Sequence, residues 1–78
     1  MQLTIKYFGM LTEATKHTEE RMHTNTCSVL ELVEKLKNQY PELKYKDFKV
    51  AVNHQLVSDD YLINNEAEIA LLPPFAGG

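Results

Sequence analysis

One amphipathic segment constrains the fold of this chain more than any other feature. In "SVLELVEKLKNQY" the apolar residues recur at the spacing of one helix face: Val29, Leu32, Val33, Leu36 and Tyr40. Ser28 and Glu31 have the spacing of a capping box, Glu31 and Lys35 are spaced for an ion pair on the outer face, and Pro41 ends the helix. Because one helix can cover only one face of a sheet, the chain is predicted to adopt a two-layer α+β fold.

Apolar and polar residues alternate before this helix, which is the pattern of half-buried strands. In "QLTIKYF" the side chains of Leu3, Ile5 and Tyr7 are predicted to point to the same side. "TEERMHT" is predicted to be a polar edge strand with Met22 facing inward, and "GMLTEATKH" before it a short helix.

The pattern continues after the helix. "PELKYKD" is predicted to be a connector, and "FKVAVN" a strand with Val50 and Val52 on one face. Asn53 and His54 form a predicted turn into a short returning strand, "QLV". "SDDYLINNE" is polar and rich in turn residues, so it is predicted to be a loop.

The last predicted strand is "AEIALL", in which Ile69 and Leu71 face the helix while Ala70 and Leu72 face away. The inward residues need the helix for their burial, so the strand is expected in the sheet, with the chain leaving from the sheet edge. Ala70 and Leu72 are candidates for an apolar patch that docks onto partners.

A chain of 78 residues has room for one domain, which buries roughly 60–65% of the surface of the unfolded chain. So small a core leaves little space for an enclosed active site, which favours a binding or carrier module over an enzyme that acts alone. The net charge is -3 and the basic residues are scattered, which argues against nucleic acid as a partner.

The cysteine content and the apolar runs indicate a compartment. Cys27 is the only cysteine, so no internal disulfide can form, and this suits the reducing cytoplasm. "MQLTIKYFG" lacks the features of a signal peptide, and "IALLPPFA" is too short to span a bilayer. A cytoplasmic protein that does not act at a membrane is therefore expected.

The side chains that could react are few. Cys27 lies just before the helix start, where a thiolate can be stabilised, but no histidine neighbours it in sequence, and an inert, buried thiol is the favoured interpretation. His17, His23 and His54 lack the spacing of metal ligands, so no metal site is expected.

Acidic residues precede the end of the chain, and they are Asp59, Asp60, Glu66 and Glu68. Two interpretations remain open for them. They could steer a basic partner surface towards this part of the molecule, or they could belong to a solvated loop.

The last residues, "LLPPFAGG", have an unusual composition. Two consecutive prolines cannot continue a strand, so residues 1–72 are predicted to form the domain and residues 73–78 an extended tail with a reach of roughly 20 Å. Gly77 and Gly78 lack a Cβ and can pass through a slot that excludes other residues. The tail is expected to present the carboxylate of Gly78 to the active sites of other proteins, where adenylation by ATP would activate it for transfer to sulfur or an amine.

The segment "AEIALLPPFAGG" resembles the C-terminus of the small subunits of molybdopterin synthases, a family of sulfur carriers. Six residues fit the family pattern position by position: Pro73, Pro74, Phe75, Ala76, Gly77 and Gly78. The resemblance also covers "LTIKYFGMLTEAT" and "VAVNHQLVSDD", so it spans most of the chain, although only its end is strongly diagnostic.

This resemblance implies a ubiquitin-like β-grasp fold, a mixed sheet of about four or five strands on one main helix with a flexible C-terminal tail. It implies that an adenylyltransferase related to ubiquitin-activating enzymes adenylates Gly78 with ATP and that a sulfur donor converts it to a thiocarboxylate. Sulfur would then pass to a cyclic pterin precursor in the large catalytic subunit, so this subunit would bind no cofactor and would not be an enzyme alone. The implied complex is a heterotetramer. The residues implied in partner binding are Leu72, Pro73, Pro74, Phe75, Ala76 and Gly77.

One turn departs from the family pattern, and three other functions stay open. The family commonly has Gly-Asp before the last strand, whereas here the turn reads Asn65, Glu66, Ala67; Asn65 is expected to take the left-handed conformation of the glycine. The alternatives are a sulfur carrier for thiamine biosynthesis, a ubiquitin-like modifier that forms isopeptide bonds, and a plain interaction domain.

Overall fold

The computed structural model of the protein describes residues 1–74. Helix α2 (Val29–Gln39) has the predicted capping box: the Ser28 side chain accepts a bond from the Glu31 N–H at 3.1 Å, and the Ser28 N–H donates to Glu31 Oε1 at 2.8 Å. The predicted Glu31–Lys35 ion pair is wrong, because the ion pairs of residues 1–74 lie elsewhere and the Glu31 carboxylate turns back to the cap. The predicted apolar face is confirmed and buried against the sheet.

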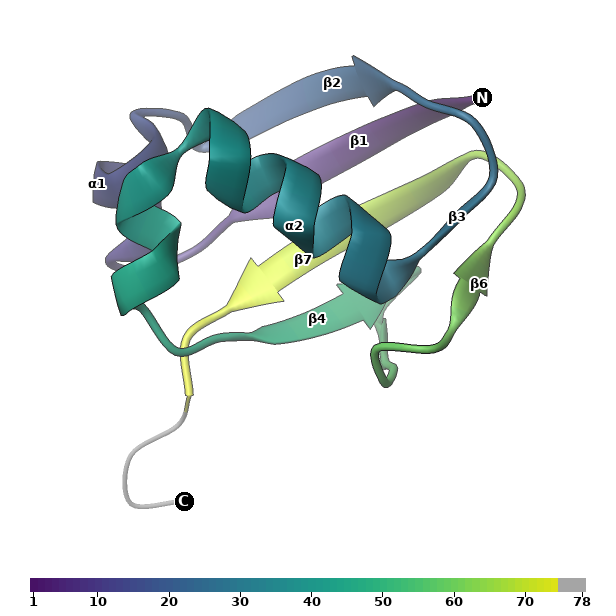
Figure 1. Ribbon diagram of the computed structural model, residues 1–78. Helices are drawn as coiled ribbons and strands as arrows, with labels where there is room; N and C mark the ends of the chain where they lie inside the picture. The colour runs from purple at the N-terminus through teal and green to yellow at the C-terminus, as the bar shows by residue number, and fades with distance from the viewer. Residues whose placement is uncertain (75–78) are drawn as a thin grey trace.

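The main sheet has five strands in the order β2-β1-β7-β4-β5. Their bounds are β1 Gln2–Tyr7, β2 Glu19–His23, β4 Lys49–Val52, β5 Gln55–Leu56 and β7 Ala67–Leu72. β1 and β7 are parallel, and the other neighbours are antiparallel (Figure 1). The sheet is therefore mixed, and the polar strand β2 lies at its edge, as predicted.

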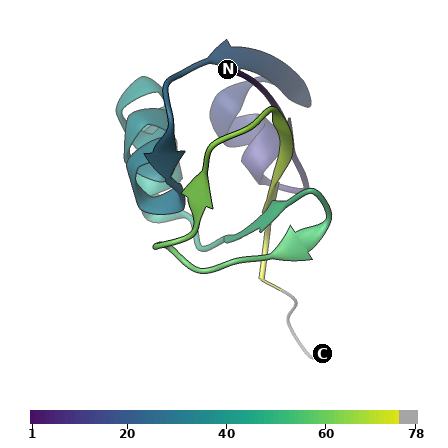
Figure 2. The same ribbon diagram turned by 90° about the vertical axis from the view of Figure 1, so that its right-hand side faces the viewer.

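Helix α2 covers one face of this sheet, and Figure 2 shows the two layers edge-on. The alternation in β1 and β7 is confirmed, because the inward residues Leu3, Ile5, Ile69 and Leu71 are fully buried in the core. Burial of each such side chain contributes about 1.5–3 kcal/mol. Within residues 1–74, no helix covers the opposite face of the sheet (Figure 2).

Two short elements were not predicted. Within "SDDYLINNE", β6 (Leu62–Ile63) pairs with β3 (Cys27–Ser28) in a second, two-stranded sheet. Carbonyls of the same segment accept the first two helical N–H groups of α2, from Val29 and Leu30, at 3.0 Å each. These donors have no partner inside a helix, so the segment completes the N-terminus of α2.

Two short helices flank the core. The predicted short helix is α1 (Leu11–Thr15), and the expected connector contains a 3-10 helix, η1 (Pro41–Tyr45), which buries Leu43. Within residues 1–74, no helix is both long and apolar enough to cross a membrane.

One predicted turn is confirmed and one predicted conformation is wrong. Asn53 (φ 51°) and His54 (φ 70°) are both left-handed, as the two-residue hairpin between β4 and β5 requires.

Among residues 1–74 the other non-glycine residue with positive φ is Lys16, so Asn65 does not take the glycine conformation. Strands β6 and β7 belong to different sheets, and their open connection at Asn65 needs no tight hairpin turn.

A hydrogen-bonded cluster ties α2 to the sheet. The hydroxyls of Tyr7 and Tyr40 both donate to Glu20 Oε2, at 2.5 Å and 2.8 Å, and the two rings meet edge-on at 6.2 Å. Tyr7 is buried in β1, Glu20 lies in β2, and Tyr40 caps the C-terminus of α2. Burial, reinforced by the hydrogen bond to Glu20 and its charge, raises the pKa of Tyr7 above its usual range and that of Tyr40 to about 12.

This cluster leads to a stability prediction. Because both tyrosines hold their protons more tightly in the folded chain, the stability they contribute is complete below about pH 10 and falls as the pH rises above that value. We expect Tyr7→Phe to cost about 1.5–3 kcal/mol at neutral pH and to make this alkaline decline shallower. Urea unfolding between neutral and alkaline pH measures both effects. The exposed Tyr45→Phe is the control and should behave like the wild type, and an unchanged decline in Tyr7→Phe would contradict the prediction.

Candidate functional site

The chain leaves the domain from the centre of the sheet. β7 lies between β1 and β4, so the prediction that the tail leaves from the sheet edge is wrong (Figure 1). The reason is that parallel pairing with β1 and antiparallel pairing with β4 occupy both sides of β7. β7 ends at Leu72, as the two following prolines predict; Pro73 is half-buried and Pro74 is exposed. The predicted site residues Phe75, Ala76, Gly77 and Gly78 lie outside the described residues.

The face of the sheet opposite α2, termed the open face, is divided into two halves. Its apolar half consists of Phe8, Ala51, Leu56, Ala70 and Leu72, which line a hollow of about 350 Å³ together with Lys6, His54 and Glu68. Its polar half borders a second hollow, of about 560 Å³, and includes Gln2, Thr4, Glu19, Arg21 and Glu66. The outward orientation predicted for Ala70 and Leu72 is therefore confirmed.

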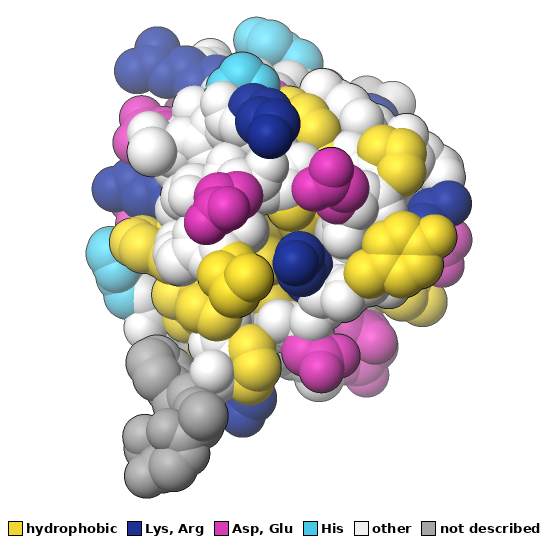
Figure 3. Space-filling model, turned by 90° about the vertical axis from the view of Figure 1, so that its left-hand side faces the viewer, with side chains coloured by type: hydrophobic (Ala, Val, Ile, Leu, Met, Phe, Trp, Pro, Cys, Tyr) yellow, Lys and Arg dark blue, Asp and Glu magenta, His cyan; other side chains and the backbone are white. Residues whose placement is uncertain are grey.

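The pairing of β1 with β7 places the apolar half beside the chain exit. The two strands are parallel, with Leu3 opposite Ala67 and Tyr7 opposite Leu71, so both run from the polar half towards the apolar half. Phe8, which follows β1 and is 44% exposed, lies at the same end as Leu72. Figure 3, which looks onto this end of the molecule, shows hydrophobic side chains gathered in its lower left part.

Phe8 and Leu56 are site residues that sequence reasoning missed. The sequence did contain a signal for Phe8. The outward-facing positions of β1 are polar up to Lys6, and the next outward position, Phe8, is apolar. Leu56, 58% exposed, lies directly opposite Ala51 across the β4–β5 pair, and cross-strand partners point to the same face.

A charged group separates the two halves. Glu68 lies between Lys6 and His54, with Lys6 Nζ 3.3 Å from Oε1 and His54 Nε2 3.5 Å from Oε2. The side chain of Asn53 accepts the Glu68 N–H at 3.0 Å, and this bond holds the β4–β5 turn against β7. Exposed ion pairs of this kind add little stability to the fold.

The acidic residues predicted to precede the tail do not form one surface. Glu68 is paired on the open face, whereas Asp59 lines a different hollow, next to α2. Asp60 accepts a hydrogen bond from its neighbour Ser58 at 2.6 Å. Local partners therefore account for Glu68 and Asp60.

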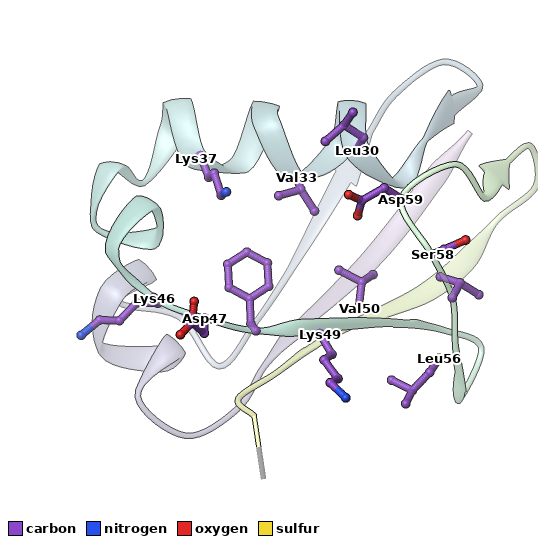
Figure 4. A pocket seen from close by; sticks show the side chains of 12 residues that line it. Leu30, Val33, Lys37, Lys46, Asp47, Lys49, Val50, Leu56, Ser58 and Asp59 are labelled. Atoms are coloured by element: carbon purple, nitrogen blue, oxygen red, sulfur yellow. The ribbon is translucent and has the colours of Figure 1, made fainter. Parts of the chain in front are cut away.

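The hollow next to α2 has a volume of about 590 Å³ and contains none of the predicted site residues. Figure 4 shows Val33 and Lys37 from the helix facing Val50 from β4 across it. Lys37 Nζ lies 5.9 Å from the centre of the Phe48 ring, which partly closes the hollow. Its lining mixes lysines with carboxylates and apolar groups, so it does not select one class of ligand.

The remaining reactive side chains lie apart from this surface. Cys27 is half-buried in β3 and packs against the core, and His17 stacks edge-on against Tyr40 at 5.9 Å. Within residues 1–74, no three His, Cys, Asp or Glu side chains are grouped as they would be around a metal ion. The arrangement suits docking to another protein beside the chain exit.

Similar solved structures share this architecture. A Pyrococcus furiosus protein assigned as molybdopterin converting factor, subunit 1, is 22% identical with a TM-score of 0.88, over 96% of this chain and 99% of that one. SAMP1 from Haloferax volcanii is 20% identical with a TM-score of 0.82, over 100% of both chains. A complex of subunits 1 and 2 of molybdopterin-converting factor from Helicobacter pylori contains a chain that is 22% identical, with a TM-score of 0.71 over 100% of both chains.

At these identities the structural likeness shows the fold, and it confirms the predicted β-grasp architecture. The sequence model of the ThiS family matches residues 5–78. The match therefore extends well beyond the C-terminal segment that carries the strongest resemblance. With nearly the whole chain matched and the mixed sheet and helix in place, this protein belongs to the ThiS family and has the fold of the ubiquitin-like sulfur carriers.

Proposed function

We propose that this chain is the sulfur-carrying small subunit of a molybdopterin synthase. The observation that carries the proposal is the apolar half of the open face, which lies beside the strand end from which "PPFAGG" continues. A carrier must be held by its partner while its C-terminus is chemically handled, and a docking surface beside the exit allows this. Membership of the ThiS family and the resemblance of the chain end support the same function.

The proposed chemistry takes place on the carboxylate of Gly78, which is a poor electrophile as it stands. A carboxylate oxygen attacks the α-phosphorus of ATP, pyrophosphate leaves, and an acyl adenylate forms. Sulfide-level sulfur from the donor then attacks the carbonyl carbon, breaks its bond to the AMP oxygen, and leaves a thiocarboxylate, AMP and a proton. The partner adenylyltransferase supplies the catalytic groups, while this chain supplies reach and, at Gly77, a backbone without a side chain.

The large subunit is the proposed acceptor of the loaded chain. In the Helicobacter pylori structure, subunits 1 and 2 of molybdopterin-converting factor form a complex. We propose that a corresponding large subunit docks on the apolar half of the open face and receives Leu72 and the residues after it. Two sulfur deliveries to a cyclic pterin precursor would make a dithiolene. We propose the cytoplasm as the site of the reaction, because the reaction needs ATP and a reduced sulfur donor. We also propose two copies of each subunit, as the family resemblance implies.

A ubiquitin-like modifier is the second candidate. It is favoured by the likeness to small archaeal modifier protein 1 from Methanosarcina acetivorans, which has a TM-score of 0.80 over 99% of this chain. A modifier uses the same adenylation but transfers its carbonyl carbon to a lysine amine. The two functions therefore differ in the product formed at Gly78.

The mass of the C-terminal peptide, from protein purified out of its native host, tests the proposal. Whole-protein mass is ambiguous, since replacing oxygen by sulfur is nominally equal to oxidising one of the three methionines. A sulfur-for-oxygen shift at Gly78 is the expected result. Peptides joined through Gly78 to a lysine would indicate the modifier instead.

A second experiment tests which biosynthetic pathway uses the loaded carrier. The loaded protein is mixed with a molybdopterin synthase large subunit and the cyclic pterin precursor, and loss of the thiocarboxylate is followed by mass. Loss that requires the precursor supports the proposal. A thiocarboxylate that persists in this mixture but is consumed by thiamine thiazole synthesis would assign the chain to the thiamine pathway. A Gly78 carboxylate that stays unmodified in the presence of the activating enzyme and ATP would reject both carrier functions.

A further inference from the structure

The turn after β1 touches the first residue of the tail. Because β1 and β7 are parallel and Tyr7 lies opposite Leu71, the residues that follow the two strands leave side by side. Gly9 then lies against Pro73: a Cβ built on Gly9 would be 3.0 Å from Pro73 Cγ and 3.8 Å from its Cβ and Cδ. Real Cβ atoms essentially never come closer than this to another heavy atom. The contact therefore depends on the absence of a side chain at residue 9.

Gly9 cannot easily move away to make room for a side chain. Its carbonyl oxygen accepts both the N–H and the hydroxyl of Thr12, at 3.1 Å and 2.8 Å. The preceding carbonyl, of Phe8, accepts the N–H of Leu11 at 3.1 Å, and Leu11 is buried in the core. Gly9 also has φ +60°, in the left-handed region that L side chains rarely adopt. The turn is thus anchored to α1, and added volume has to be accommodated by Pro73.

Pro73 transmits such a displacement along the chain. Leu71 and Leu72 before it are held by pairing with Val50 and Lys49, so the strand cannot shift as a whole. A proline ring fixes φ near −65°, and a following proline restricts Pro73 itself to extended conformations. A change in the orientation of Pro73 therefore becomes a change in the direction of the residues that follow.

We propose that Gly9 is a positioning residue for the carrier reaction. By leaving space for Pro73, it sets the direction in which the chain leaves the domain, so that a partner docked on the open face finds the C-terminus at its active site. The effect of Gly9 on the carrier reaction rests on the proposed function, whereas the contact between Gly9 and Pro73 does not. Gly9 touches no reacting atom and acts through Pro73.

The kinetic test compares Gly9→Ala, Pro73→Ala and the double variant in adenylation by the activating enzyme. We expect Gly9→Ala to lower kcat about 10-fold with KM within about twofold. Pro73 has to shift by a few tenths of an ångström, misplacement of about 1 Å can cost about 100-fold, and docking through the sheet persists. The double variant lacks Pro73 Cγ, so adding Gly9→Ala to Pro73→Ala should lower kcat no further than Pro73→Ala does alone. Its melting temperature should stay as low as that of Gly9→Ala, because backbone strain at residue 9 remains.

A structural measurement keeps the inference testable even if the proposed function is wrong. In the wild-type protein we expect nuclear Overhauser effects between the Gly9 Hα and the Pro73 ring protons. A nitroxide spin label attached to Gly78→Cys, in a Cys27→Ser background, broadens the amide signals of the residues that lie near it. The set of broadened amide signals should change when Gly9→Ala is added and return to the wild-type pattern in the double variant. Absent Overhauser effects, or a double variant more impaired than Pro73→Ala and as altered as Gly9→Ala, would overturn the inference and leave only strain in the turn.

Discussion

Gly77→Val is expected to lower the rate of thiocarboxylate formation at Gly78 at least about 100-fold. The physical reason is that valine adds a branched side chain and restricts the backbone where the proposed chemistry needs a thin and adaptable chain. The core lies within residues 3–71, so the free energy of unfolding should not change. Mass spectrometry of the C-terminal peptide after incubation with activating enzyme, ATP and sulfur donor measures the rate.

A size series at the same position sharpens this result. Gly77→Ala adds one methyl group without branching and should lose less activity than Gly77→Val. Urea unfolding of both variants is the control for the fold. Loading of Gly77→Val at the wild-type rate would refute the idea that the C-terminus passes through a narrow slot.

Phe8→Ala is expected to weaken binding of the large subunit about 30-fold or more. An aromatic side chain at the centre of a docking surface contributes about 2 kcal/mol or more when it is buried by a partner. Phe8 belongs to the apolar half of the open face and is half-exposed in the free domain, so its loss should barely affect folding. Isothermal titration calorimetry with the large subunit gives the affinity directly.

Tyr45→Ala is the matched control, because it also removes an exposed aromatic ring, one that is 85% exposed on η1 and lies outside the open face. It should bind the large subunit as the wild type does. Equal losses in Phe8→Ala and Tyr45→Ala would mean that the open face is not the docking surface, and unchanged binding of Phe8→Ala would mean the same.

Local patterns predicted the local elements well. The capping box at Ser28 and the apolar face of α2 are interactions between residues three or four apart, so a short stretch of sequence contains all that they need. The same holds for the alternation in β1, for the Asn53–His54 hairpin turn and for the end of β7 before Pro73. Patterns failed for β3 and β6, because two-residue strands are too short to show a period.

The candidate site depended on contacts that are distant in sequence. Phe8 and Leu72 come together because β1 and β7 are parallel neighbours, and Tyr7, Glu20 and Tyr40 meet because three elements pack at one place. Sequence patterns placed Leu72 on the correct face but could not reveal what lies beside it.

The sequence by itself determined that a single helix packs on one face of a sheet and that a strand stops at two prolines before Gly-Gly, because these features follow from hydrophobic period, capping and the missing N–H of proline. Only the tertiary structure decided that this strand is the central one, that an apolar surface lies at its end, and that Gly9 contacts Pro73. The physical reason is that strand order and parallel pairing are chosen by burial across the whole sheet, and no short segment contains that information.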